Sequence, residues 1–205
     1  MMKMTNDNID LELAEEIDYL IDLLSKSGFF SKDEILEILE DQFIEEELDF
    51  SQIDISSFES SNISFNRLEN VFNSLARKNI VAIHNCGFDI EEGVADAFEL
   101  FVHLRNNKFN PEGFCFYTFE DVEDCLAENY LNITFGDFEN NEHKALEIGK
   151  IVAKSLESAD FEIEWDGTIN NQIKINPFKW DKSFSDDREY EIEGAYEVYI
   201  KQVLK

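Results

Sequence analysis

Apolar residues recur every three or four positions in two stretches near the start of the chain, residues 10–26 and 32–47. This spacing places them along one face of a helix, so both stretches are predicted to be amphipathic α-helices. Gly28 ends the first helix, and Ser31 with Glu34 has the spacing of a capping box at the start of the second. The apolar faces of the pair need a third surface to pack against, which we expect to be the main domain or another subunit.

Helical spacing then alternates with short apolar runs over the rest of the chain. Helices are predicted at 66–78, 91–105, 119–126 and 142–158, and strands at 80–83, 113–117 and 131–135. Strict alternation at 161–165 and 173–175, with turn residues between them, predicts a hairpin. We therefore expect an α/β (α+β) fold, with a mixed sheet of about five strands and flanking helices, preceded by an acidic helical pair.

The composition changes along the chain and divides it into three parts. Residues 49–63 are rich in Ser, Asp and Ile, and they are the best linker candidate between the acidic helices and the more balanced region that follows. We expect an acidic N-terminal helical pair at 1–62, an α/β core domain at 63–182 and a C-terminal tail at 183–205. The tail is compatible with a docking strand, a last helix or an oligomer contact.

Acidic residues outnumber basic ones by 46 to 17, which gives a net charge of -29 over 205 residues. Residues 1–62 hold 18 acidic and 3 basic residues, so under a third of the chain carries about half of the charge. Such a field repels nucleic-acid phosphate and anionic lipid and attracts basic protein surfaces. We therefore expect a basic protein partner and neither a nucleic-acid nor a membrane partner. The alternative is that the charge only keeps the surface solvated.

The compartment is predicted from the sequence start and the cysteines. No apolar stretch that would form a signal peptide follows the first residues, and no run is long enough to cross a membrane. Cys86, Cys115 and Cys125 are odd in number and lie in apolar surroundings, which fits reduced thiols in a core better than a disulfide framework. We expect a cytoplasmic protein.

Few residues have the spacing that catalysis or metal binding requires. Cys86 and His84 lie two positions apart, so a nucleophilic thiol beside a base is one interpretation, and a turn Cys with a partly buried His is the more frequent one. The Cys and His spacings match no zinc motif, and the sequence contains neither a calcium loop nor a glycine-rich phosphate loop. We therefore predict no catalytic residue, no metal ion and no cofactor.

Several short motifs resemble those of a bacterial family known only as a domain of unknown function. They are Gly113-Phe114-Cys115-Phe116-Tyr117 with Asp121 four residues on, Phe135-Gly136, Trp165-Asp166-Gly167-Thr168 with Trp180 after the next strand, and Asn85-Cys86-Gly87 with Gly93 downstream. The helical pair at residues 10–47 also resembles the N-terminal region of that family, so the resemblance covers the chain up to about Lys182. It implies no activity, because none is established for the family.

The chain departs from the family pattern directly after the strand at 113–117. There the family usually has His, then a small residue and Gln, whereas this chain has Thr118, Phe119 and Glu120. If that His is catalytic in other members, this chain has lost it. The departure weakens an enzymatic interpretation.

Eight residues form the candidate partner-binding site. Four are acidic positions on the outer side of the second helix, and four lie at or just after the ends of predicted strands of the core domain, where polar side chains of α/β domains commonly form sites. They are Glu37, Glu40, Asp41 and Glu45 on the helix, and Tyr117, Asp121, Trp165 and Asp166 near the strand ends. For Trp165 the alternative is a ring packed beside a tight turn, and for Asp121 it is a helix cap.

Three functions are compatible with these observations. The first is a non-catalytic acidic module that inhibits a basic partner, such as a bacterial immunity protein that neutralises a toxin. The second is a small cytosolic enzyme with a site at the strand ends, near Asn85, Tyr117, Asp121 and Asp166. The third is an intracellular scaffold or assembly subunit, with an oligomeric state that the sequence does not define. We favour the first.

Overall fold

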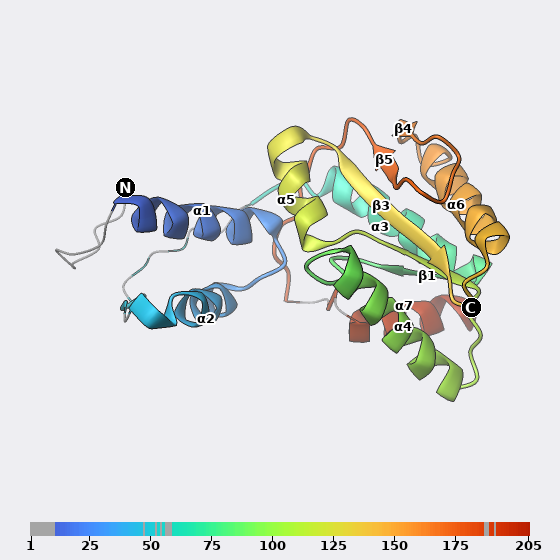
Figure 1. Cartoon of the computed structure of the whole chain (residues 1–205), viewed down its shortest axis with the longest axis horizontal. Coiled ribbons are helices and arrows are strands. Elements are labelled where there is room, and N and C mark those ends of the chain that lie inside the picture. The colour runs from blue at the N-terminus through green and yellow to red at the C-terminus, as the bar shows by residue number, and fades with distance from the viewer. Residues whose placement is uncertain are drawn as a thin grey trace. The chain divides into compact units, whose positions relative to one another are not determined.

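The computed structural model describes residues 11–46, 48–51, 53, 55, 59–186, 189–190 and 192–205 (Figure 1). The chain forms two compact units. The first consists of Met1–Asn62 with Asp181–Asp186, and the second of Ile63–Trp180 with Asp187–Lys205. Among the described residues, no helix has the length and apolar composition of a membrane span.

The first unit contains the acidic helical pair. Helix α1 spans Leu11–Ser27 and α2 spans Lys32–Gln42, followed by a short 3-10 helix, η1, at Ile44–Glu46. The predicted capping box is present at the start of α2. The Ser31 hydroxyl accepts from the Glu34 N–H at 3.2 Å, and the Glu34 carboxylate accepts from the Ser31 N–H at 2.6 Å.

Helix α2 is shorter than its spacing predicts, because regular helix stops at Gln42; residue 47 itself lies outside the described residues. Phe43 caps the helix by donating its N–H to the Leu39 carbonyl, and its ring packs against Phe50 at 6.1 Å between centroids. The acidic residues that follow would lie at the negative end of a longer helix, which opposes its extension.

The apolar faces of α1 and α2 are buried. Ile17 and Leu24 of α1, and Ile35 and Leu39 of α2, are each at most 3% exposed. Burying four such side chains contributes roughly 6 to 12 kcal/mol before the entropy of ordering the chain is subtracted. The spacing of apolar residues therefore determines which side of each helix is buried, and the charged residues lie on the opposite, exposed side.

A segment from the far end of the sequence belongs to the first unit. Asn62 donates its N–H to the Asp181 carbonyl at 3.1 Å. Ser183 donates its N–H to Asn62 Oδ1 at 2.7 Å, across 121 residues of sequence. The first unit is therefore assembled from two distant stretches of chain.

Lys182 attaches this segment to the end of α1. Its side chain is 1% exposed, and the ammonium group donates to the carbonyl of Gly28, which follows the last residue of the helix. The same group lies 4.6 Å from the centre of the Phe29 ring. A cation at this place is favoured by the negative end of the helix dipole and by the face of the ring.

The second unit is built on one sheet. Its strands are β1 (Ile80–Ile83), β2 (Gly113–Phe116), β3 (Leu131–Asp137), β4 (Ile163–Glu164) and β5 (Ile173–Ile175). The order across the sheet is β1-β2-β3-β5-β4, with β1 and β2 parallel and every other neighbouring pair antiparallel. The predicted five-stranded mixed sheet of an α+β fold is confirmed, including the terminal hairpin.

Helices cover both faces of this sheet (Figure 1). Helices α3 (Ile63–Leu75) and α6 (Glu142–Glu157) pack on one face, and α3 continues into a short 3-10 helix, η2 (Ala76–Lys78). Helices α4 (Ile90–Asn106) and α5 (Phe119–Glu128) lie on the other. Two helical layers thus enclose the sheet of the second unit.

Gly113 lets α6 approach the sheet closely. A Cβ atom at this position would lie 2.0 Å from Cδ1 of Ile148 in α6 and 2.5 Å from the carbonyl oxygen of Gly136 in β3. The next residue, Phe114, points to the opposite face and joins the core under α4. Position 113 therefore has no room for a side chain.

Helix α7 (Ile192–Val203) lies against β1, the edge strand of the sheet. The sequence leaves this segment open between a strand, a helix and an oligomer contact, and the structure shows a helix. Ala195 and Tyr199 are 9% and 2% exposed and join the core of the second unit. A helix in this place keeps the unpaired backbone groups of an edge strand from pairing with another chain.

Candidate functional site

The four acidic candidates of the second helix lie on the surface of the first unit. Glu37, Glu40 and Asp41 are exposed on α2, and Glu45 is exposed in η1. They belong to a larger set, because all twelve acidic residues between positions 11 and 46 are exposed. Burial of the apolar faces of α1 and α2 leaves these carboxylates on the outside.

Few basic groups offset this charge. Residues 11–46 contain two lysines, of which Lys26 pairs with Asp22 at 2.7 Å while Lys32 is exposed. An exposed ion pair of this kind contributes little to stability. The third described lysine of the unit, Lys182, is buried. The described surface of the helical pair is therefore strongly negative.

The remaining candidates lie in the second unit, beginning with Tyr117. Because β1 and β2 are parallel, the residues that follow them, His84 and Tyr117, meet at one edge of the sheet. The Tyr117 hydroxyl and His84 Nδ1 are 2.9 Å apart, and the two side chains are 0% and 5% exposed. The His84 ring also lies 4.6 Å from the Phe72 ring between centroids. Tyr117 thus contacts the core and has no exposed surface in this structure.

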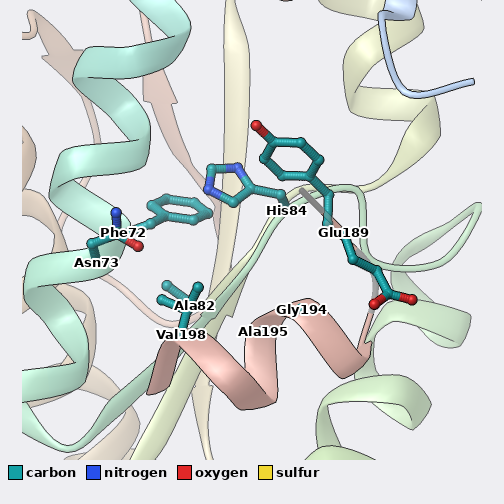
Figure 2. Close-up of a pocket in the computed structure, with 9 residues that line it drawn as sticks. Phe72, Asn73, Ala82, His84, Glu189, Gly194, Ala195 and Val198 are labelled. Carbon is teal, nitrogen blue, oxygen red and sulfur yellow. The ribbon is translucent and has the colours of Figure 1, made fainter. Parts of the chain in front are cut away.

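A small cavity lies beside His84 (Figure 2). Its volume is about 10 Å³, and it is bounded by α3, β1 and α7 through side chains that include Phe72, Ala82 and Val198. This is roughly the space of one water molecule. This cavity is therefore too small to admit a substrate.

Asp121 is buried at the start of α5, where it forms a capping box with Thr118. Its Oδ2 accepts from the Thr118 N–H at 2.9 Å and from the Thr118 hydroxyl at 3.0 Å. The Thr118 hydroxyl oxygen in turn accepts from the Asp121 N–H at 3.2 Å. Gln172 Nε2, just before β5, lies 3.5 Å from Asp121 Oδ1 and donates to Thr134 Oγ1 at 2.9 Å. The cluster joins α5 to β3 and β5.

Burial raises the pKa of Asp121 above its ordinary value, and hydrogen bonds from Thr118, Asn132 and Gln172 partly offset this effect. A perturbed pKa is common among catalytic carboxylates, but it also arises in buried structural ones. The hydrogen-bond partners of Asp121 are hydroxyl, amide and backbone groups, so the observed arrangement positions the start of α5.

Trp165 and Asp166 organise the loop between β4 and β5. The Trp165 indole N–H donates to the carbonyls of Thr168 and Asn171 at 3.0 and 3.2 Å, and its ring packs edge-on against Phe135 at 5.4 Å. Asp166 is exposed and accepts from Asn171 Nδ2 at 2.6 Å and from the Thr168 N–H at 3.0 Å. These hydrogen bonds, foremost the one from Asn171, lower the pKa of Asp166.

The structure therefore distributes the eight candidates among separate places. The four on α2 and η1 share the surface of the first unit. In the second unit, Tyr117 and Asp121 are linked through Thr118 in the interior, whereas Trp165 and Asp166 lie in the hairpin loop. A role for any of the eight in partner binding stays a prediction.

The three thiols are buried, and burial raises their pKa values, that of Cys125 to about 12. The Cys86 thiol donates to the Gly93 carbonyl at 3.3 Å, while Nδ1 of His84 is engaged by a tyrosine hydroxyl. A thiolate nucleophile needs an electropositive setting, which these positions lack. Within the described ranges, no three His, Cys, Asp or Glu side chains are grouped so that they could hold a metal ion.

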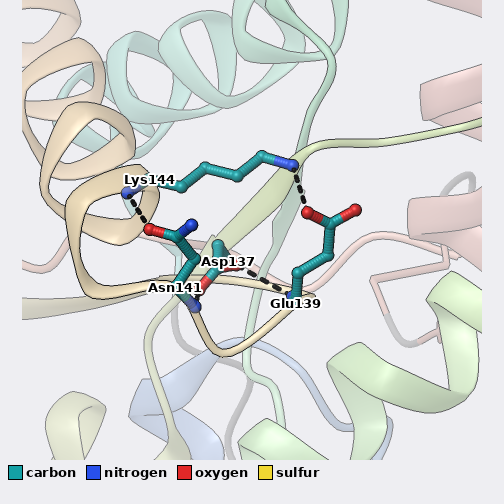
Figure 3. Close-up of polar contacts among 4 residues, drawn as sticks. All are labelled: Asp137, Glu139, Asn141 and Lys144. Atoms are coloured by element: carbon teal, nitrogen blue, oxygen red, sulfur yellow. Dashed lines mark hydrogen bonds and ion pairs between the residues drawn. The ribbon is translucent and has the colours of Figure 1, made fainter.

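A polar loop that follows β3 is absent from the site residues predicted from the sequence (Figure 3). Asp137 is 8% exposed and accepts from the N–H groups of Glu139 at 2.8 Å and of Asn141 at 2.9 Å. Asn141 caps α6 by accepting from the Lys144 N–H at 3.1 Å, and the Lys144 ammonium pairs with Glu139 at 3.3 Å. The feature of the sequence that could have predicted this loop is Asn141, because Asn is a favoured capping residue and lies directly before the helix. The loop fixes the entry of the chain into α6.

Comparison with known families gives a match over residues 10–184. The chain belongs to DUF6891, a domain of unknown function. The resemblance drawn from the strand and turn motifs is thus confirmed, and the DUF6891 match runs from α1 through β5 and ends before α7. No curated protein and no solved structure matches the chain. Membership of DUF6891 assigns no activity, so a function has to be argued from the surfaces and the interior of this protein.

Proposed function

We propose that this DUF6891 protein is a non-catalytic acidic protein-binding module that inhibits a basic partner, as an immunity protein inhibits a toxin. One observation carries the proposal: the twelve carboxylates of residues 11–46 are all exposed, against two lysines. We place the contact at Glu37, Glu40, Asp41 and Glu45, with Lys or Arg side chains of the partner opposite them.

The physical basis is electrostatic steering toward a preformed surface. Like charges one helical turn apart repel each other, and a cationic partner relieves that repulsion. The same field raises the rate at which an oppositely charged protein associates, by tenfold or more at low salt. Because the capping box and the buried apolar faces already order α2, little conformational entropy is lost on binding.

An enzyme at the strand ends has less support. Tyr117 and Asp121 are buried and hydrogen-bonded to core groups. The cavity beside His84, of about 10 Å³, would hold little more than one water molecule.

Equilibrium binding to the basic products of adjacent reading frames tests the proposal. The Glu37→Lys, Asp41→Lys variant reverses two exposed carboxylates one turn apart on α2. The matched control, Asp124→Lys with Glu128→Lys, makes the same change in net charge with the same spacing on α5. We expect the α2 pair to weaken binding at low salt by about tenfold, and the α5 pair by much less.

Two results would remove the proposal. The first is that none of these basic proteins binds with an affinity that falls as salt is raised. The second is that the α2 and α5 pairs lose the same affinity, since net charge alone would then explain the effect.

A further inference from the structure

A groove on the second unit lies between helices α4 and α7, outside the surface that the proposed function assigns to partner binding. Figure 1 shows the two helices beside each other. The volume of the groove is about 560 Å³, which falls within the range of ligand sites. It is lined by Glu99, Val102, His103 and Asn106 of α4 and by Ile192, Glu193, Tyr196 and Glu197 of α7.

The floor of the groove is apolar and partly open to solvent. Val102 is 55% exposed, and Ile192 and Tyr196 are only partly buried against the core. The Tyr196 ring lies 4.4 Å from the His103 ring between centroids, so the two helices are joined across the groove. The signal in the sequence is Val102, an apolar residue that lies outside the inward stripe of its helix.

Exposed carboxylates surround this floor. Glu99, Glu193 and Glu197 are exposed, and the ion pairs found among the described residues lie elsewhere. The negative field extends along α4, where burial, followed by repulsion from Glu99 and Glu92, raises the pKa of Asp96. Of the basic residues of the two helices, Arg105 and Lys201 do not line the groove, whereas His103 does.

We infer that this groove binds a cationic amphipathic segment of a protein partner. An aliphatic side chain of that segment packs on Val102 and Ile192, and Lys or Arg side chains reach the glutamates of the rim. Charge complementarity selects this occupant, because a second copy of a chain with a net charge of -29 would bring acid against acid. The inference rests on the proposed function in one respect, that the partner is a basic protein, and adds a second contact surface in the other unit.

The test follows the methyl signals of Val102 and Ile192 by NMR in the full chain, while a short synthetic peptide that alternates Lys and Leu is added. Both signals should shift, and a peptide with Glu in place of Lys should leave them unmoved. Reversing two rim charges one turn apart, in Glu193→Lys with Glu197→Lys, should weaken binding about tenfold.

Two control variants separate the contributions. Asp124→Lys with Glu128→Lys makes the same change in charge on α5 and should have little effect. Val102→Ser removes apolar contact without changing the charge, and it should also weaken binding of the peptide. A purely electrostatic association would not be weakened by this substitution.

The inference is overturned if the two methyl signals do not move, or if the α5 pair weakens binding as much as the α7 pair. It is also overturned if spermidine binds as tightly as the peptide, because the groove would then be a small-cation site.

Repeating the titration in the Glu37→Lys, Asp41→Lys variant separates the two surfaces. If the methyl signals still shift in that variant, the groove binds the peptide independently of the α2 carboxylates. If the peptide shifts only signals of α1 and α2 in the unmodified chain, the groove inference is wrong and the proposed function is not contradicted.

Discussion

A buried hydrogen bond between the Tyr117 hydroxyl and His84 Nδ1 joins two side chains that directly follow β1 and β2. Tyr117→Phe removes the hydroxyl and keeps the ring, so it deletes a 2.9 Å contact between two buried side chains. We expect the free energy of unfolding of the second unit to fall by about 1 kcal/mol in urea denaturation. The control is Tyr130→Phe, whose hydroxyl lies 3.5 Å from Asp124 near the surface. Equal losses in both variants would contradict this reading of the Tyr117 contact.

The burial of Asp121 leads us to expect a pH dependence of the free energy of unfolding. Its sign is opposite to the one expected for a carboxylate in an ion pair. Burial raises its pKa in the folded protein, so folding favours the protonated form. The stabilisation is fully present below the unfolded pKa of about 4 and is lost as pH rises through the folded pKa. Asp121→Asn removes this titration. The free energy of unfolding of the unmodified protein, relative to that of the variant, should therefore fall as pH rises from about 4. Urea denaturation over a pH series measures the difference, and a difference that stays constant or grows would rule out the raised pKa.

The type and order of the elements follow from apolar spacing, whereas their ends and contacts do not. Strand β1 and the capping box of α2 lie where the sequence predicts them. The early end of α2 depends on the contact of the Phe43 ring with Phe50, which spacing alone does not reveal. The helical state of residues 192–203 is favoured by their place against an edge strand, and this is tertiary information.

The packing of β2 against α6 leads to a prediction at the scale of elements. Gly113→Ala puts a methyl group within 2.0 Å of Ile148 Cδ1 and 2.5 Å of a backbone oxygen. Overpacking of this kind costs about 1–3 kcal/mol, measured as a loss in the free energy of unfolding. Gly167→Asn is the control, because no atom lies within 4 Å of a Cβ there and Asn tolerates a φ of +78°. A Gly113→Ala variant as stable as the unmodified chain would show that the two layers are not tightly packed.

At the scale of the whole molecule, the net negative charge affects the stability of the folded state. A net charge of -29 destabilises the compact state through self-repulsion. Raising NaCl from roughly 20 to 500 mM shortens the screening length from about 20 to about 4 Å. We therefore expect Tm to rise over this range in circular dichroism melts. A Tm that stays constant or falls would mean that the carboxylates are already compensated.

The sequence predicts the acidic surface of the helical pair, because composition and helical periodicity suffice to place carboxylates on the outer face. It does not reveal that Asp181–Asp186 completes the first unit, or that α7 meets α4 to form a groove. Both depend on contacts between residues far apart in the chain. Tyr117 and Asp121 are identified as polar residues after strands, but only the structure shows that they are buried.

The proposed function is tested by the rate of association with a basic protein from an adjacent reading frame, measured by stopped flow over a range of salt concentrations. We expect the rate constant to fall steeply as salt rises. At low salt, Glu37→Lys with Asp41→Lys should reduce it by about tenfold, and the matched α5 pair should not. A rate constant that is independent of salt, or that both pairs reduce equally, would contradict the claim that this protein acts through the negative surface of its helical pair.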